Sequence, residues 1–126
     1  MSPSSPRKTP RPESFLPLRP AELLILHVLN AGEQHGYAIV HAVERESEGT
    51  VRLHPGALYR MLHRLLGDGL LAESDERPAP DLDDARRRYY GITPLGRAVL
   101  TAEVERLGRL VRAVRTSGSA PRPRTA

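Results

Sequence analysis

The sequence predicts a mainly α-helical domain with a small β-hairpin, followed by a long C-terminal helix. Three observations lead to this fold class: apolar residues recur at spacings of three and four, two short strand candidates flank a polar loop, and an apolar stripe follows that hairpin. A chain of 126 residues is long enough for one domain with a modest core. We therefore expect a single folded unit.

Both ends of the chain differ in composition from the middle. Residues 1–17 carry five prolines among Ser, Arg and Lys, and residues 117–126 read SGSAPRPRTA. Neither end offers enough apolar surface to offset the entropy lost on ordering it. We expect a disordered basic, proline-rich tail at 1–17, a second disordered tail at 117–126, and the fold between them.

Apolar spacing and helix breakers predict the first two helices. Over Pro20–Leu29 the segment PAELLILHVL is apolar on almost every side, so this helix is buried by its own domain or by a partner. Its candidates for contact with a partner are Leu23 and Leu26. A second, amphipathic helix is expected over Gly36–Ser47, and the β-rich segment Thr50–Leu53 follows it as a short strand.

The third helix has the clearest signals. Pro55 suits a first helical turn, Gly67 and Gly69 suit the end, and leucines repeat along one face. The opposite face begins with small residues, continues with basic ones and contains no acid. It comprises Gly56, Ala57, Arg60, His63 and Arg64.

A hairpin and a long helix complete the prediction. Leu70–Ser74 and Arg87–Ile92 enclose a polar loop as two arms that need helices to pack against. Thr93 followed by proline is a strong helix start, and this last helix should run over 94–116. Its apolar residues step by 4, 3, 4 and 3, as in a two-helix seam, so a second copy of the chain is the expected cover. The stripe consists of Leu100, Val104, Leu107, Val111 and Val114.

This order of elements is that of a winged helix-turn-helix over residues 18–93, with a dimerisation helix over 94–116. In that arrangement the third helix enters the major groove of DNA, and the hairpin lies along the backbone or in the minor groove. Because arginine pairs bidentately with guanine, Arg60 is the first candidate for a base contact. Further DNA contacts are expected from the third helix at Pro55, Gly56, Ala57, Tyr59, His63 and Arg64, and from the hairpin at Arg77, Arg86, Arg87 and Arg88.

Part of this set has a structural alternative. The arginine run 86–88 is also explained as a solvated charge run balanced by the acidic residues of the loop. Core packing is the favoured interpretation for Tyr37 and for one of the neighbours Tyr89 and Tyr90, which must face opposite sides of a strand. Tyr37 and Tyr90 are nevertheless kept as candidates for DNA contact.

Several function classes find no support in the sequence. The chain has no cysteine, which excludes disulfides, thiolate zinc sites and thiol catalysis, and its five histidines show no metal-ligand spacing. We find no nucleophile beside a base, no paired carboxylates and no glycine-rich phosphate loop. No apolar run approaches the length of a membrane span. We expect a cytoplasmic protein that is not an enzyme and uses no metal or cofactor.

Four motifs together resemble the successive signatures of the PadR family of transcriptional regulators, in order and in spacing. The resemblance implies a homodimer, in which the C-terminal helix packs against the partner's N-terminal region, and repression of a promoter that a ligand or stress relieves. The single C-terminal helix resembles the short subgroup of the family. The motifs are HGY at 35–37, LHPGALY at 53–59, LHRL with GLL at 62–65 and 69–71, and RYYGITPLG at 88–96.

The chain departs from the family pattern at His54, Ala57 and Arg60, at the start of the third helix. These positions bear on which DNA sequence is read. The expected partners are double-stranded DNA with a pseudo-palindromic operator, a second copy of the chain, and a small apolar effector. The alternative function is a winged-helix module that meets an acidic protein through the same basic face.

Overall fold

A computed structural model of the chain describes residues 10–74 and 88–117. Its described part is mainly helical with one three-stranded antiparallel sheet of order β1-β3-β2, which confirms the predicted fold class. None of the described helices is both long enough and apolar enough to span a membrane. The elements are the 3-10 helix η1 (Pro12–Phe15), α1 (Pro20–Asn30), β1 (Gln34–His35), α2 (Gly36–Glu46), α3 (Pro55–Gly67), β2 (Leu71–Ser74), β3 (Tyr89–Ile92) and α4 (Pro94–Thr116).

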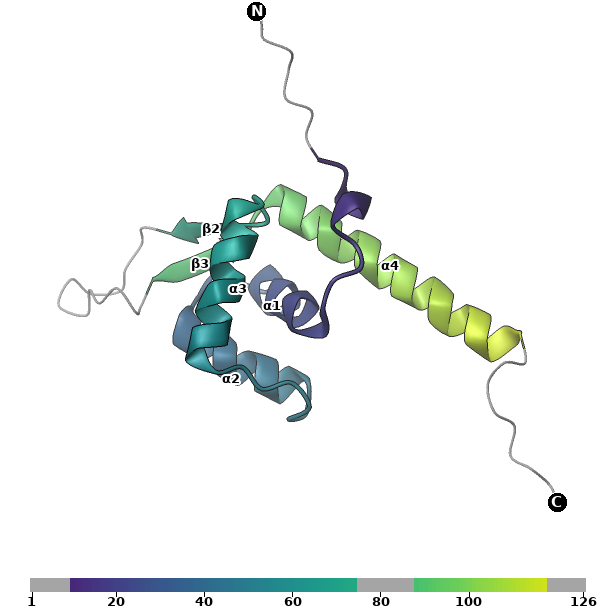
Figure 1. The fold of residues 1–126 in the computed structure, drawn as a ribbon, viewed down its shortest axis with the longest axis horizontal. Helices are drawn as coiled ribbons and strands as arrows, with labels where there is room; N and C mark the ends of the chain where they lie inside the picture. The colour runs from purple at the N-terminus through teal and green to yellow at the C-terminus, as the bar shows by residue number, and fades with distance from the viewer. Residues whose placement is uncertain (1–9, 75–87, 118–126) are drawn as a thin grey trace, which may run out of the picture.

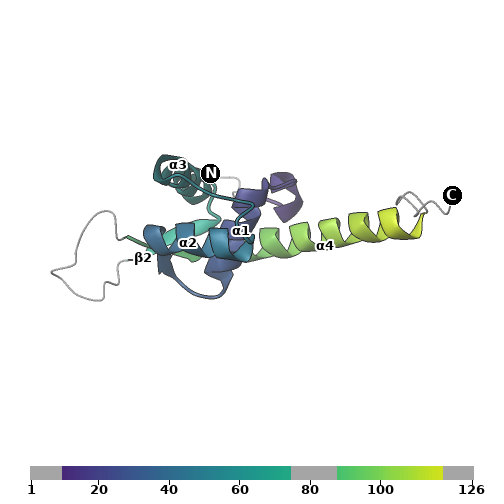
Figure 2. The same cartoon turned by 90° about the horizontal axis from the view of Figure 1, so that it is seen from below.

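The three shorter α-helices pack together beside the strands, and α4 starts at the hairpin and runs past them (Figure 1). Seen at right angles, the outer half of α4 extends away from α1, α2 and α3 (Figure 2). Residues 109–117 are accordingly exposed throughout. The domain therefore has a compact helical body and one helix that projects from it.

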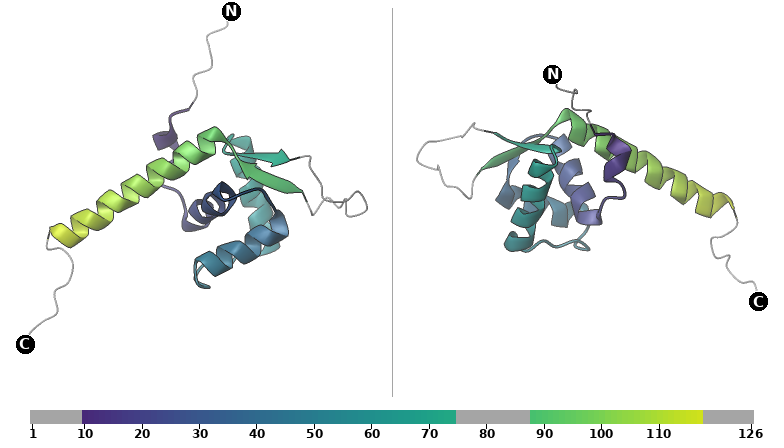
Figure 3. Two further views of the ribbon diagram at one scale, coloured as in Figure 1. Left: turned by 180° about the vertical axis from the view of Figure 1, so that it is seen from behind. Right: turned by 45° about the horizontal axis from the view of Figure 1, so that its top comes forward.

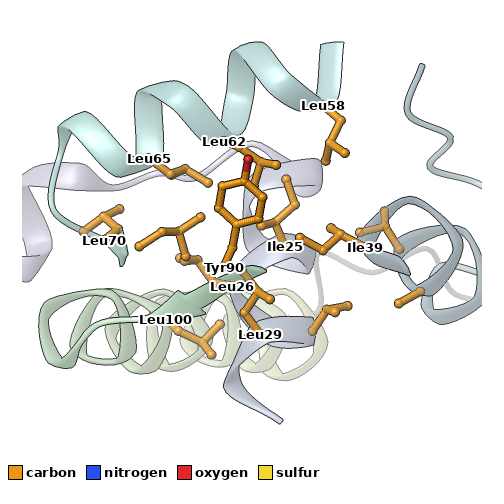
Figure 4. Close-up of a cluster of buried hydrophobic side chains, with 14 of the residues drawn as sticks. Ile25, Leu26, Leu29, Ile39, Leu58, Leu62, Leu65, Leu70, Tyr90 and Leu100 are labelled. Atoms are coloured by element: carbon orange, nitrogen blue, oxygen red, sulfur yellow. The ribbon is translucent and has the colours of Figure 1, made fainter. Parts of the chain in front are cut away.

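Side chains from every α-helix and from the sheet form the core (Figure 4). Leucines of α3 interleave with aliphatic residues of α1, and Tyr90 of β3 lies among them. Leu26 and Leu100 belong to this core, with exposed fractions of 0% and 8%. Both were expected at a dimer interface, and that expectation is wrong because their own domain already buries them.

The third strand of the sheet is not the segment expected. Gln34 and His35 pair with Tyr90 and Tyr89 as β1, whereas the predicted strand at Thr50–Leu53 forms no strand. The Oγ of Ser47 holds that segment at the end of α2, because it accepts the Val51 N–H at 3.0 Å. Thr50 and Val51 therefore belong to the loop that connects α2 and α3.

The hairpin and α4 are joined by hydrogen bonds of Thr93 and by a close approach of Gly96 to Leu70. Thr93 caps α4, since its Oγ1 accepts the Gly96 N–H at 3.0 Å and donates to the Gly69 carbonyl at 2.6 Å. The Thr93 N–H also donates to the Leu70 carbonyl at 3.0 Å. A Cβ at position 96 would overlap that same carbonyl oxygen, so the close approach requires glycine.

The N-terminal segment is placed further into the fold than its composition indicated. Disorder throughout residues 1–17 was expected, but η1 lies across α4 (Figure 3), and Phe15 and Leu16 pack against the core. The Leu18 N–H donates to a carboxylate oxygen of Glu103 at 2.8 Å. The expectation is therefore wrong for residues 12–17, and residues 1–9 lie outside the described part.

Glu103 is the anchor for this segment. Its side chain is 1% exposed, and Arg106 donates to both carboxylate oxygens at 2.6 and 2.9 Å. These bonds from Arg106, aided by the Leu18 N–H, lower the pKa of Glu103 even though burial acts to raise it. A charged carboxylate thus ties the N-terminal segment to α4.

Candidate nucleic-acid interface

The packing of α3 decides which of its residues face solvent. Leu58, Leu62 and Leu65 are buried, and their spacing of four and three places them on one side of the helix. The opposite side carries the residues that the sequence nominated for DNA contact. Of these, Pro55, Gly56, Arg60, His63 and Arg64 are exposed, whereas Ala57 and Tyr59 are half-buried.

An open hollow of about 310 Å³ lies on this side of α3, lined by Ala57, Arg60, Met61 and Arg64 together with Arg19. Arg19 directly precedes α1 and is exposed. The sequence interpretation missed it, because nothing local to Pro20 indicates that α1 begins beside the third helix. Three arginines from two separate segments therefore line one hollow.

Arg64 has a partner that the sequence did not reveal. Its guanidinium forms an ion pair with Glu22 of α1, whose side chain is 11% exposed, while that of Arg64 is 46% exposed. The other carboxylate oxygen of Glu22 accepts the Arg19 N–H at 2.9 Å. The helix face itself is free of acids as expected, but α1 supplies one beside it.

Tyr59 and Tyr37 both lie near the start of α2, in different environments. The ring of Tyr59 packs so closely on Gly36 that a Cβ there would meet its hydroxyl oxygen at 2.8 Å. Tyr37 is 67% exposed and stacks edge-to-face with His41 at 4.7 Å between ring centroids. Core packing of Tyr37 is therefore wrong, and its ring stays available as a surface contact.

Of the four hairpin arginines predicted to contact DNA, the structure describes only Arg88. Arg88 is exposed and donates to a Glu73 carboxylate oxygen at 3.1 Å, an exposed pair of the kind worth about 0–1 kcal/mol. The other nominated hairpin residues, Arg77, Arg86 and Arg87, lie outside the described residues.

The prediction that Tyr90 contacts DNA is wrong. Its ring points into the core (Figure 4) and is 5% exposed, because β3 turns this face towards the helices. Burial raises the pKa of its hydroxyl, as do the neighbouring Glu73 and Tyr59, while Arg88 acts in the opposite direction. Tyr89 lies on the other face, edge-on to His35 at 5.7 Å, so the alternation was predicted correctly and the wrong member was chosen.

The outer half of α4 carries an apolar surface. Val104, Val111 and Val114 of the predicted stripe are exposed by 49–55%, and Leu107 is half-buried. Leu110, which the spacing of 4 and 3 had passed over, is 49% exposed beside them. Leu23 of α1, the remaining candidate for partner contact, is half-buried against its own core.

Two histidines, His27 and His35, form hydrogen bonds in the described fold. The ring of His35 accepts the Ala38 N–H at 3.2 Å and caps α2, and His27 lies 2.8 Å from a Glu46 carboxylate oxygen. Within residues 10–74 and 88–117, no three His, Asp or Glu side chains gather closely enough to hold a metal ion.

The sequence model of the transcriptional regulator PadR-like family matches residues 25–102 of the chain, which include α3, both hairpin strands and the start of α4. The chain belongs to the PadR family. This confirms the resemblance carried by the four motifs, and it makes the protein a transcriptional regulator and not an enzyme. Membership of this family implies DNA binding.

Individual relatives agree with the family match. The PadR-family chain described here is 41% identical over 92 residues to the transcriptional regulator Rv3488 of Mycobacterium tuberculosis, an alignment that covers 73% of this chain and 79% of that one. A PadR-like transcriptional regulator from Bacillus cereus has the same fold, with a TM-score of 0.62 and 23% identity over 79% of this chain and 92% of that one. A transcriptional regulator from Clostridium thermocellum is similar, with a TM-score of 0.62 and 22% identity over 75% of this chain and 86% of that one. The fold is therefore the PadR winged helix.

Proposed function

We propose that this PadR-family regulator is a homodimeric repressor that binds a pseudo-palindromic DNA site. The observation that supports this most is the exposed side of α3. It is held rigidly by three buried leucines and carries small residues at its start and basic residues further along. The major groove admits one helix of this kind.

The residues of α3 have separable roles in this proposal. Arg60 is exposed in the middle of the helix and offers the bidentate donors that guanine accepts. His63 and Arg64 lie further along and suit phosphate oxygens, which position the helix without reading sequence. Tyr37, exposed at the start of α2, is assigned to a further contact with the DNA backbone. The arginines of the hairpin are expected to add backbone contacts.

A second copy of the chain is the proposed cover for the outer half of α4. Four aliphatic side chains of α4 are about half exposed: Val104, Leu110, Val111 and Val114. Leaving such an apolar stripe in contact with water costs free energy, and a second helix that packs against it removes that cost. Two copies related by a two-fold axis would present two α3 helices to successive major grooves, about 34 Å apart. Such a dimer accounts for the pseudo-palindromic site.

Release of the DNA by a small apolar effector completes the proposal. An open hollow of about 350 Å³ lies between η1 and α4, lined by Leu16, Pro17 and Ala102 together with charged side chains. Its volume is within the range of small-molecule sites. A ligand there would press on the segment that Glu103 ties to α4.

The proposal is tested by binding and mass measurements on the purified full chain. Fluorescence anisotropy at about 0.15 M salt should show tighter binding to a duplex from the protein's own upstream region than to a shuffled duplex of equal composition. Light scattering should give the mass of two chains. Equal binding to both duplexes, or a monomer at micromolar concentration, would contradict it. Capture of an acidic partner protein without any DNA shift would instead favour the protein-interaction module.

A further inference from the structure

The feature that carries a further inference is the basic hollow formed by Arg19, Arg60 and Arg64. Arg60 and Arg64 lie one turn apart on α3, and Arg19 comes from the segment that precedes α1. Three arginines that line one open hollow bring like charges close together, which is unfavourable unless an anion compensates them. The arrangement therefore has the character of an anion site.

Glu22 compensates this cluster only in part. Its carboxylate bonds to the Arg64 guanidinium through one oxygen and to the Arg19 backbone N–H through the other. One carboxylate among three guanidinium groups leaves the hollow positively charged. The ion pair with Glu22 also holds the Arg64 guanidinium at the surface of α1. The side chain of Arg19 takes no part in these bonds and stays exposed.

The backbone of Arg19 is held from both directions. The preceding residue, Leu18, donates its N–H to the buried Glu103 of α4, and Arg19 donates its own to Glu22 of α1. A long charged side chain on a fixed backbone loses less entropy on binding than one on a loose tail. The fold thus presents Arg19 beside α3 as a prepared donor.

We infer that Arg19 is a DNA-contacting residue, which binds a backbone phosphate next to the groove that α3 enters, and that Glu22 positions Arg64 beside it. The inference rests on the proposed function, because it takes α3 as the helix that meets DNA. Guanidinium groups match phosphate oxygens bidentately, and a phosphate in the hollow would meet arginines from α3 and from the residue that precedes α1. The site would fix the angle at which the domain sits on the duplex, independent of base sequence.

The test compares three variants of the full chain in duplex binding across a series of salt concentrations. Arg19→Ala removes the side chain and leaves the backbone bond to Glu22 in place. Arg97→Ala is the matched control, because Arg97 is an exposed arginine bonded to Asn30 at the other end of α1, about 16 Å away. Arg19→Lys keeps the charge and loses the planar fork. Thermal unfolding of each variant checks that the fold is intact.

The Arg19→Ala variant should bind both the specific and the shuffled duplex about tenfold more weakly than wild type, because it loses one phosphate contact. It should also reduce the slope of log K against log salt by about 0.9, whereas Arg97→Ala and the charge-preserving Arg19→Lys keep the wild-type slope. Arg19→Lys should lie between wild type and Arg19→Ala in affinity alone. Equal affinity and slope for Arg19→Ala and Arg97→Ala would overturn the inference while leaving the proposed function intact. A wild-type chain that fails to bind either duplex at low salt would overturn both.

Discussion

Replacing Gly96 by alanine separates tertiary packing from helix propensity. Propensity alone predicts that alanine in α4 stabilises the fold by about 1 kcal/mol. The structure predicts the opposite, because the new Cβ overlaps the Leu70 carbonyl oxygen and lies 2.9 Å from Cγ1 of Ile92. Overpacking of this kind costs about 1–3 kcal/mol, and moving Leu70 weakens its bond from Thr93 by about 1 kcal/mol more. We expect a net loss of about 1–3 kcal/mol.

Thermal unfolding followed by circular dichroism measures this loss. A change of 1 kcal/mol shifts Tm by about 4–8 °C in a domain of this size, so Gly96→Ala should melt at least about 4 °C lower. Gly108→Ala is the control, since it lies in the same helix and its Cβ would meet the end of the flexible Arg112 side chain at 3.5 Å. It should keep or raise Tm. A Tm for Gly96→Ala as high as that of Gly108→Ala would refute the packing argument.

Three further predictions concern binding, assembly and pH. Arg60→Ala should lose about 1–3 kcal/mol of discrimination at one base position in a binding-site selection; uniform weakening on every sequence would assign Arg60 to phosphate instead. Val111→Glu places a charge in the exposed stripe of α4 and should shift the mass in light scattering from dimer to monomer. Ala113→Glu is the control, because Ala113 is exposed but lies off the stripe, and it should leave the dimer intact. Equal masses for both variants would contradict an α4 interface. Glu103 has a lowered pKa, so its stabilising charge is present above the unfolded-state pKa and is lost as pH falls through the folded-state value. Glu103→Gln should therefore be less stable than wild type at pH 7 and lose less stability on acidification below about pH 4.5; parallel stability curves would show that the charge plays no part.

Local signals predicted the helices well because proline, glycine and leucine spacing act within one element. Pro55 and the leucines that follow it define α3 without reference to any other part of the chain. Thr93 caps α4 through a neighbour three residues away. The exposed side of α3, with the proposed base contact Arg60, follows from the same spacing.

Contacts between distant segments decided what the sequence could not. Glu22 and Arg64 are 42 residues apart, and Leu18 and Glu103 are 85 apart, so no local pattern reports either bond. The first of these bonds adds an acid beside the α3 face, and the second orders a segment whose composition indicated disorder. Long-range packing supplies both.

The tyrosine pair of β3 shows a different limit. Strand alternation correctly placed Tyr89 and Tyr90 on opposite faces. Which face meets the helices depends on how the hairpin packs against the body of the domain, and this is not encoded in a four-residue strand. The same uncertainty affected Leu26 and Leu100, whose apolar character suits a core and a dimer seam equally.

A DNase footprint on the protein's own upstream region, at about 0.15 M salt, tests dimeric and sequence-specific DNA recognition most directly. Two protected half-sites with two-fold related sequences, centred about 34 Å apart, are expected for two α3 helices in successive major grooves. The Arg60→Ala variant should lose this protection at concentrations where Arg97→Ala retains it. Protection of a single half-site, or diffuse protection that both variants share, would contradict recognition by a paired α3.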